Sequence, residues 1–148
     1  LQSNTVGKNK EYTLRFDSEL TIQMLIFTEQ YKTAQFFEDN FAFEQLKRTL
    51  REYDVDVAIA FGSRVKGYAN QNSDLDLLII GNFPEKCDKD IKTNLPLDVD
   101  TTVLTKNEFK QGLEKQKLFI QDVNREHIIL CGTEKYVSWR IQAIDRRQ

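Results

Sequence analysis

The sequence predicts an α+β fold, with an N-terminal appendage of one strand and helices followed by a domain of strands and helices. Two observations predict this class. Before residue 54, apolar side chains recur mainly at helical spacing. After residue 54, short apolar runs typical of strands, such as residues 55–61 and 75–80, are separated by segments of helical or turn character. We therefore divide the 148 residues into an appendage, 1–53, and a main domain, 54–148.

The appendage is predicted to hold one strand and two helices. Residues 1–10 are polar and carry no predicted element, whereas 11–16 alternate polar and apolar side chains, which predicts a half-buried strand. Asp17 or Ser18 can cap the helix that follows. The apolar side chains of that helix recur at Leu20, Met24, Phe27 and Tyr31. A second helix is expected over 33–53, bent or broken at Asp39 and Asn40.

The main domain alternates strands with helices and turns. We expect strands at 55–61, 74–80, 95–104 and 127–131, and helices at 64–68, 84–92, 105–117, 119–125 and 134–147. Residues 69–73 are expected to form a loop. Thr105 is a suitable N-cap, and Glu108 three residues later completes a capping box.

The composition excludes several classes of protein. A net charge of -2 and a pI near 5.5 give no global electrostatic case for nucleic-acid binding. No apolar run reaches the ~20 residues that a membrane span needs, and no signal peptide is visible, so we expect a cytoplasmic protein. Cys87 and Cys131 lack CxxC spacing and are expected to be free thiols. The lone His127 is expected at the surface or at a sheet edge.

Paired carboxylates are the strongest chemical signal in the chain. Asp74 and Asp76 open a predicted strand, and because side chains alternate along a strand they share one face. Two carboxylates on one face favour a hard divalent cation that carries phosphates. A third carboxylate should come from the later strand, where we favour Asp100 because it lies deeper in apolar sequence; Asp98 is the alternative. Asp100 would also lie nearest an attacking hydroxyl, which it could help to deprotonate.

The turn before these aspartates has the residues that a phosphate site needs. Gly62 allows the backbone to approach a phosphate closely, and Ser63 offers a hydroxyl and an amide. Arg64 and Lys66 follow in the same short segment and can reach a triphosphate or an acceptor. Ser73, directly before the first aspartate, can bond a phosphate or shape the turn.

Residues 62–67, Gly-Ser-Arg-Val-Lys-Gly, and 73–78, Ser-Asp-Leu-Asp-Leu-Leu, resemble the signature of the DNA polymerase β-like nucleotidyltransferase superfamily. Within it, the chain most resembles the minimal nucleotidyltransferases related to the kanamycin-type enzymes. Residues 99–105 resemble the third-aspartate strand of that family, which favours Asp100 over Asp98.

The resemblance implies a small mixed β-sheet with helices packed on one side. It also implies Mg²⁺, expected as two ions, held by Asp74, Asp76 and Asp100, and phosphate held by Gly62 and Ser63. The implied enzyme is a nucleotidyltransferase of the EC 2.7.7 type. It would transfer a nucleoside monophosphate from an NTP, with ATP expected, to an acceptor hydroxyl that the sequence does not identify, and release pyrophosphate.

The resemblance also suggests partners and two alternative functions. Minimal members of the family often work with a separate helical chain of the HEPN type, and some act as antitoxins that attach AMP to it. Residues 6–14 and the helix after them resemble the wing and following helix of a winged helix-turn-helix, so a non-enzymatic DNA-binding regulator is the other alternative. DNA binding is expected only if such a domain precedes this chain. A second copy of the chain is one candidate to bury the first helix.

Overall fold

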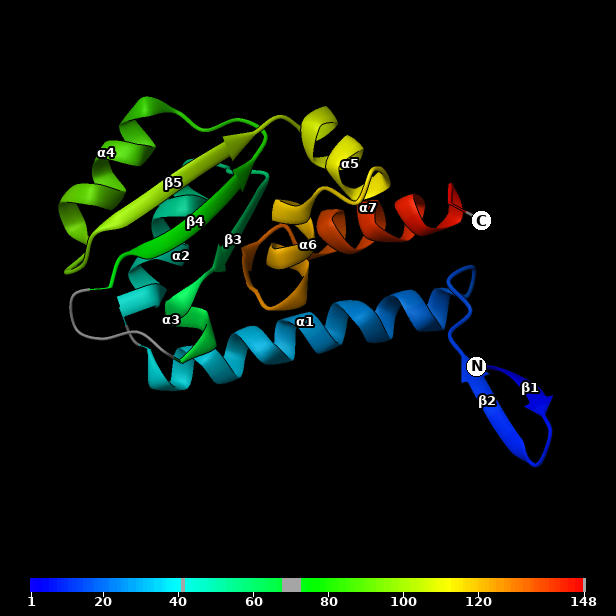
Figure 1. Ribbon diagram of the computed structural model, residues 1–148. Coiled ribbons are helices and arrows are strands. Elements are labelled where there is room, and N and C mark those ends of the chain that lie inside the picture. Colours follow the sequence, from blue (N-terminus) through cyan, green and yellow to red (C-terminus); the bar gives the residue numbers. More distant parts are fainter. Residues whose placement is uncertain (41, 68–72, 148) are drawn as a thin grey trace.

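A mixed four-stranded sheet forms the centre of the computed structural model, which describes residues 1–40, 42–67 and 73–147. Its strands are β3 (Val57–Phe61), β4 (Leu75–Ile80), β5 (Val99–Leu104) and β6 (Ile128–Cys131), in the order β5-β4-β3-β6 (Figure 1). β4 and β5 are parallel, whereas β3 is antiparallel to both β4 and β6. The predicted α+β class and mixed sheet are confirmed.

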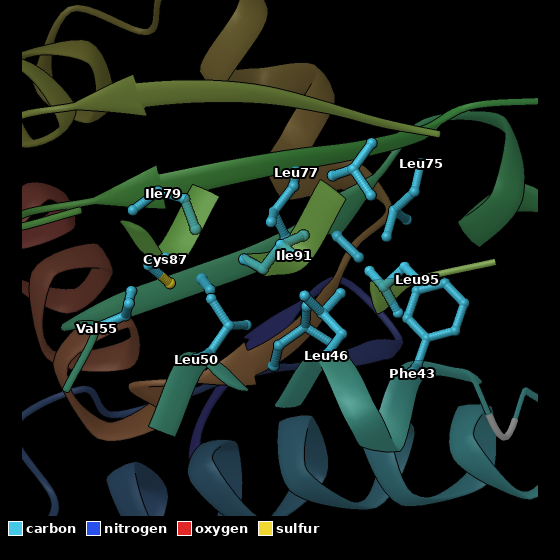
Figure 2. Packing of buried hydrophobic residues seen from close by; sticks show 14 of the residues in the cluster. Phe43, Leu46, Leu50, Val55, Leu75, Leu77, Ile79, Cys87, Ile91 and Leu95 are labelled. Atoms are coloured by element: carbon cyan, nitrogen blue, oxygen red, sulfur yellow. The ribbon is translucent and has the colours of Figure 1, made fainter. Parts of the chain in front are cut away.

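Helices cover both faces of this sheet. One face packs against α2 (Ala42–Glu52) and α4 (Glu85–Asn94), and Figure 2 shows Leu46, Leu50 and Ile91 from these helices beside Leu77 and Ile79 of β4. The other face packs against α5 (Lys106–Glu114), α6 (Leu118–Arg125) and α7 (Thr133–Asp145). The implied packing of helices on one side is therefore wrong. Because nearly every residue of β3 and β4 is apolar and buried, both faces need cover.

α1 (Glu19–Asp39) begins after Ser18 and runs along the domain (Figure 1). Thr33, near its middle, donates a hydrogen bond of 3.0 Å to the carbonyl of Ile129 in β6. α1 runs without interruption through residues 31–33, so the predicted start of a second helix at residue 33 is wrong. The predicted break is present at Asn40, whose side-chain amide donates to the carbonyl of Phe36 at 2.8 Å. α2 follows and buries Leu46 in the core beneath the sheet. A domain boundary after residue 53 stays a prediction.

The N-terminal residues form a hairpin that the sequence predicted only in part. β1 (Gln2–Val6) pairs antiparallel with β2 (Asn9–Thr13), and all ten residues are exposed. The turn between them contains Gly7 at φ +62°. β1 was not predicted because its side chains are polar on both faces, so it lacks the alternation that marks a half-buried strand.

Most other predicted elements are present, with shifts at their ends. α3 (Ser63–Lys66) is shorter than expected, and β5 begins at Val99 because residues 95–98, which include Pro96, do not join the ladder. The predicted capping box is confirmed, with the Glu108 amide donating to the Thr105 hydroxyl at 3.2 Å. The predicted loop at 69–73 falls, except for Ser73, outside the described residues.

Both cysteines are free, as expected: Cys87 is buried and Cys131 is half-buried. Among the described residues, no helix is long and apolar enough to cross a membrane.

His127 is buried, so its predicted place at the surface is wrong. Its Nδ1 lies 3.1 Å from the carbonyl of Val123, and its Nε2 lies 3.0 Å from a carboxylate oxygen of Glu29 in α1. Burial acts to raise the pKa of Glu29, but hydrogen bonds and charge from His127 and Lys32 outweigh it and lower that pKa to about 2. The pair joins α1 to the start of β6. It involves residues 98 positions apart, which is why local sequence gave no sign of it.

We expect Leu46→Ala to lower the free energy of unfolding by about 2–5 kcal/mol, because Leu46 is only 1% exposed between α2 and the sheet. Urea denaturation followed by circular dichroism would measure the change. Gln45→Ala, an exposed position on the same helix, is the control and should change stability by no more than about 0.5 kcal/mol. Equal effects of the two substitutions would contradict the placement of α2 in the core.

Candidate active site

Two aspartates lie side by side where β4 and β5 begin. The parallel register pairs Asp76 with Asp100, and neighbours in register share a face of the sheet. Asp76 is half-buried and Asp100 is exposed. Asp74 is exposed directly before β4, two residues from Asp76. The opening of two parallel strands therefore brings residues 24 positions apart in sequence to one edge of the sheet.

Asp76 lies within the electrostatic influence of the other two carboxylates. Burial raises the pKa of Asp76 above its ordinary value, and the charges of Asp100 and then Asp74 raise it further. Like charges at a partly buried site favour the neutral form of one carboxyl group unless a cation compensates them. A cation bound at this site would therefore stabilise the ionised form of Asp76.

Gly62 closes one side of this carboxylate group. It follows β3, whose last residue Phe61 pairs with Asp76 across the ladder. Gly62 adopts φ +79° and ψ -158°, a conformation that side chains other than hydrogen rarely allow. A Cβ atom added there would lie 2.0 Å from Oδ2 of Asp76. The backbone at Gly62 therefore lies directly against the Asp76 carboxylate.

The short helix after Gly62 is tied to the start of β4. Ser63 opens α3, and Arg64, which is half-buried, donates from Nε to the carbonyl of Ser73 at 2.6 Å. Lys66 is exposed at the end of α3. The structure thus brings the two predicted segments, 62–66 and 73–76, together as one unit.

Asp98 lies at the side of this group. Its carbonyl accepts a hydrogen bond of 2.8 Å from the amide of Leu75, and Asp98 itself is exposed. It lines an open hollow of about 500 Å³ together with Arg64, Asp74 and Lys92. Asp100, not Asp98, is the residue in register with Asp76.

The residues present are of the type that binds a hard divalent cation such as Mg²⁺. Among residues 1–40, 42–67 and 73–147, no three histidine, cysteine, aspartate or glutamate side chains converge as a ready-made metal cage. Mg²⁺ does not require one, because it keeps several waters and is usually held by one or two carboxylates and substrate phosphates. The donor set here consists of carboxylate oxygens, which suits that mode of binding.

An aromatic pair beside the site was missed by the sequence analysis. The rings of Phe61 and Phe119 meet edge to face, with centroids 5.6 Å apart, and Phe119 is 40% exposed. Phe61 is the cross-strand neighbour of Asp76, so Phe119 of α6 lies close to the carboxylates. Only the packing of α6 on the sheet creates this contact. No local pattern around residue 119 could have indicated it.

A four-stranded mixed sheet with aspartates at the start of two parallel strands and a Gly-Ser turn beside them defines the polymerase β-like class of nucleotidyltransferases. The profile of the family described as "Polymerase beta, Nucleotidyltransferase" matches residues 44–136, more than half of the chain, and the chain belongs to this family. The resemblance found in the sequence is confirmed. Membership supports nucleotidyl transfer in general as its activity.

One similar solved structure is described as "Crystal structure of the toxin-antitoxin with AMP-PNP". It is 17% identical to this chain, with a TM-score of 0.48, and the similar region covers 72% of this chain and 86% of the other. A comparison with curated protein sequences gave no match.

Proposed function

We propose that this chain is a Mg²⁺-dependent nucleotidyltransferase that transfers a nucleoside monophosphate from an NTP, with ATP expected, to an acceptor hydroxyl in the cytoplasm. The observation that carries the proposal is the register of Asp76 with Asp100, with the Gly62 backbone packed against Asp76. Mutually repelling carboxylates beside a close-approach glycine are what a metal-bound triphosphate requires.

The three carboxylates act on the metal and on the acceptor. Asp74, Asp76 and Asp100 would hold Mg²⁺, expected as two ions, which supplies Lewis-acid stabilisation of the phosphate oxygens. Asp100, exposed at the outer strand, would take the proton of the acceptor hydroxyl. The acceptor oxygen then forms a bond to the α-phosphorus as the bond from that phosphorus to its bridging oxygen breaks. Pyrophosphate leaves with the electron pair.

The remaining residues would position the nucleotide. Gly62 and Ser63 would approach the phosphates through backbone amides and the Ser63 hydroxyl, while Arg64, Lys66 and Ser73 would bind phosphate oxygens. The hydrogen bond from Arg64 to the Ser73 carbonyl joins α3 to the residue before Asp74, which supports a fixed orientation of these phosphate-binding residues. The exposed ring of Phe119 offers an apolar surface on which a base could stack.

The direct test is transfer of label from each α-labelled NTP to material in a lysate of the source cell, with and without Mg²⁺. Label that appears on an acceptor only when Mg²⁺ is present supports the proposal. If no NTP labels any acceptor and none binds with Mg²⁺ in calorimetry, the proposal fails.

Asp100→Asn and Asp98→Asn form a matched pair for the third carboxylate. We expect Asp100→Asn to lower transfer at least ~100-fold, because the group that binds metal and accepts the proton is lost. Asp98→Asn should change it no more than a few-fold. Initial rates of label transfer measure both, and the reverse order of effects would assign the role to Asp98.

The antitoxin alternative concerns the identity of the acceptor. A helical HEPN-type chain would then be both the binding partner and the molecule that receives AMP. The exposed apolar face of α1 is the observation that favours a protein partner. Neutralisation of such a partner that survives Asp76→Asn would make binding, not transfer, the function. The alternative of a DNA-binding regulator is disfavoured by the net charge of -2.

A further inference from the structure

A small hollow between α5, α6 and α7 gathers positively charged side chains that the proposed reaction does not use. Its volume is about 300 Å³. Its polar lining consists of three arginines and three amide side chains, namely Arg125, Arg140, Arg147, Gln116, Gln121 and Asn124. Figure 1 shows α5 beside both α6 and α7. None of the residues that line this hollow belongs to the candidate active site or to the hollow beside Asp74.

Helical spacing directs the charged side chains toward one opening. Gln121 and Arg125 are four residues apart on α6, and Arg140 and Arg147 are seven residues apart on α7 and in the turn at its end. Both spacings bring side chains to the same face of a helix. Two helices thus present their polar faces to the same space.

Close contacts fix the floor and one wall of the hollow. A Cβ atom added at Gly112 would lie 2.7 Å from Cγ1 of Ile120, so α5 and α6 pack tightly at the floor. The hydroxyl of Tyr136 donates to Oδ1 of Asn124 at 2.6 Å, which leaves the amide hydrogens of Asn124 for another acceptor. The guanidinium carbon of Arg140 lies 5.7 Å from the centroid of the Tyr136 ring. These donors are therefore held in place before a ligand binds.

Acidic residues do not compensate the charge of this hollow. None of the described residues that line it is an aspartate or a glutamate, although the chain holds 23 acidic and 21 basic residues. In the described part of the chain Arg140 and Arg147 form no ion pair, and Arg147 instead donates from Nε to the carbonyl of Ala143 at 3.0 Å. Arg125 has an exposed partner in Asp122 at 3.7 Å, and such pairs are weak in water. Because arginine stays protonated, a bound anion is what relieves the repulsion among the three side chains.

We propose that this hollow binds an anion with two or three linked phosphate groups, as in pyrophosphate or a nucleotide. A guanidinium group donates two parallel hydrogen bonds to a phosphate, and three such groups suit a ligand with several negative charges. A volume of about 300 Å³ is at the lower end of the range for small-molecule sites, so the ligand is compact. The site does not depend on the proposed reaction, because the two share no residue.

Calorimetric titration of the full chain with inorganic tripolyphosphate in the presence of EDTA tests this site. We expect a single site with a Kd below about 1 mM. Arg147→Gln should weaken binding about tenfold, because it removes a charged donor from the hollow. Arg146→Gln is the matched control, since Arg146 bonds Glu114 and does not line the hollow. It removes the same charge one position away and should change the Kd no more than about twofold. Circular dichroism melting checks that both variants fold.

Titrations with pyrophosphate and ATP, again without metal, separate the two sources of the phosphate chain. ATP that binds more tightly than tripolyphosphate, and that Arg147→Gln weakens, identifies a nucleotide as the ligand. Equal or weaker binding of ATP identifies the phosphate chain alone. Arg64→Gln reports on the candidate active site and should leave tripolyphosphate binding unchanged. The proposal is overturned by no binding up to about 10 mM, by an equal loss in Arg146→Gln, or by a loss in Arg64→Gln without one in Arg147→Gln.

Discussion

Asp76→Asn is expected to reduce nucleotidyl transfer at least ~1000-fold while leaving the fold intact. Asp76 is the half-buried member of the carboxylate group, and the charges of both Asp100 and Asp74 act on it. Losing the charge that holds the metal removes several kcal/mol of transition-state stabilisation, and each ~1.4 kcal/mol is a tenfold change in rate. Asparagine has nearly the same shape, so the packing against Gly62 is kept.

The stability of this variant distinguishes lost chemistry from lost folding. Without a cation, burial and like charges raise the pKa of Asp76, so its ionised form opposes folding and a neutral side chain relieves that repulsion. We therefore expect Asp76→Asn to melt at the same temperature as the wild type or higher. Asp122→Asn, an exposed aspartate on α6, is the control for the substitution itself and should keep full activity. A low-activity variant that also unfolds easily would contradict this account of Asp76.

Gly62→Ala is expected to lower activity about 100-fold and to cost about 1–3 kcal/mol of stability. The new methyl group would lie 2.0 Å from Oδ2 of Asp76, so the carboxylate or the turn must move. Alanine at φ +79° adds backbone strain. A shift of ~1 Å in a catalytic group is enough for a hundredfold loss of rate.

Gly67→Ala is the matched control for that prediction. Gly67 also has a positive φ, +76°, and ends the same short helix, but its ψ of 11° lies in the left-handed helical region, and among the described residues no atom lies within 4 Å of a Cβ atom added there. It should cost ~1 kcal/mol of stability through backbone strain alone and change activity no more than a few-fold. Rates of label transfer and urea denaturation of both variants measure the difference. Equal loss of activity would mean that a positive-φ substitution anywhere in this turn, and not contact with Asp76, explains the effect.

Several features could be predicted because their causes are local in the sequence. The apolar runs that became β3 and β4 are strands that are buried except at Phe61 and Asp76. The Thr105–Glu108 capping box depends on residues three apart. Strand alternation predicted a shared face for Asp74 and Asp76, and of the two only Asp76 lies within β4, which begins at Leu75. The Gly-Ser turn between these strands carried its own signature. Together they identified the family that the profile match confirms.

Other features could not be predicted because they depend on residues far apart in the chain. The burial of His127 against Glu29, the contact of Phe119 with Phe61, and the covering of both sheet faces all result from helices packing across the sheet. The apolar spacing of α1 predicted a helix, but it could not say which side would meet the domain. The spacing and the apolar composition of side chains on a helix are the same whether that side of the helix is buried or exposed.

The sequence by itself determined the class of this protein, the strands of its four-stranded sheet and the residue types at its site, because backbone periodicity and side-chain chemistry depend on neighbouring residues. The tertiary structure alone decided that Asp100 lies in register with Asp76, since the pairing of β4 with β5 joins residues 24 positions apart. It also decided that Leu20, Met24, Phe27 and Tyr31 of α1 are exposed in the part of the chain that the structure describes. That outcome depends on which side of α1 packs more favourably on the sheet and its helices, a free-energy difference that no local pattern contains.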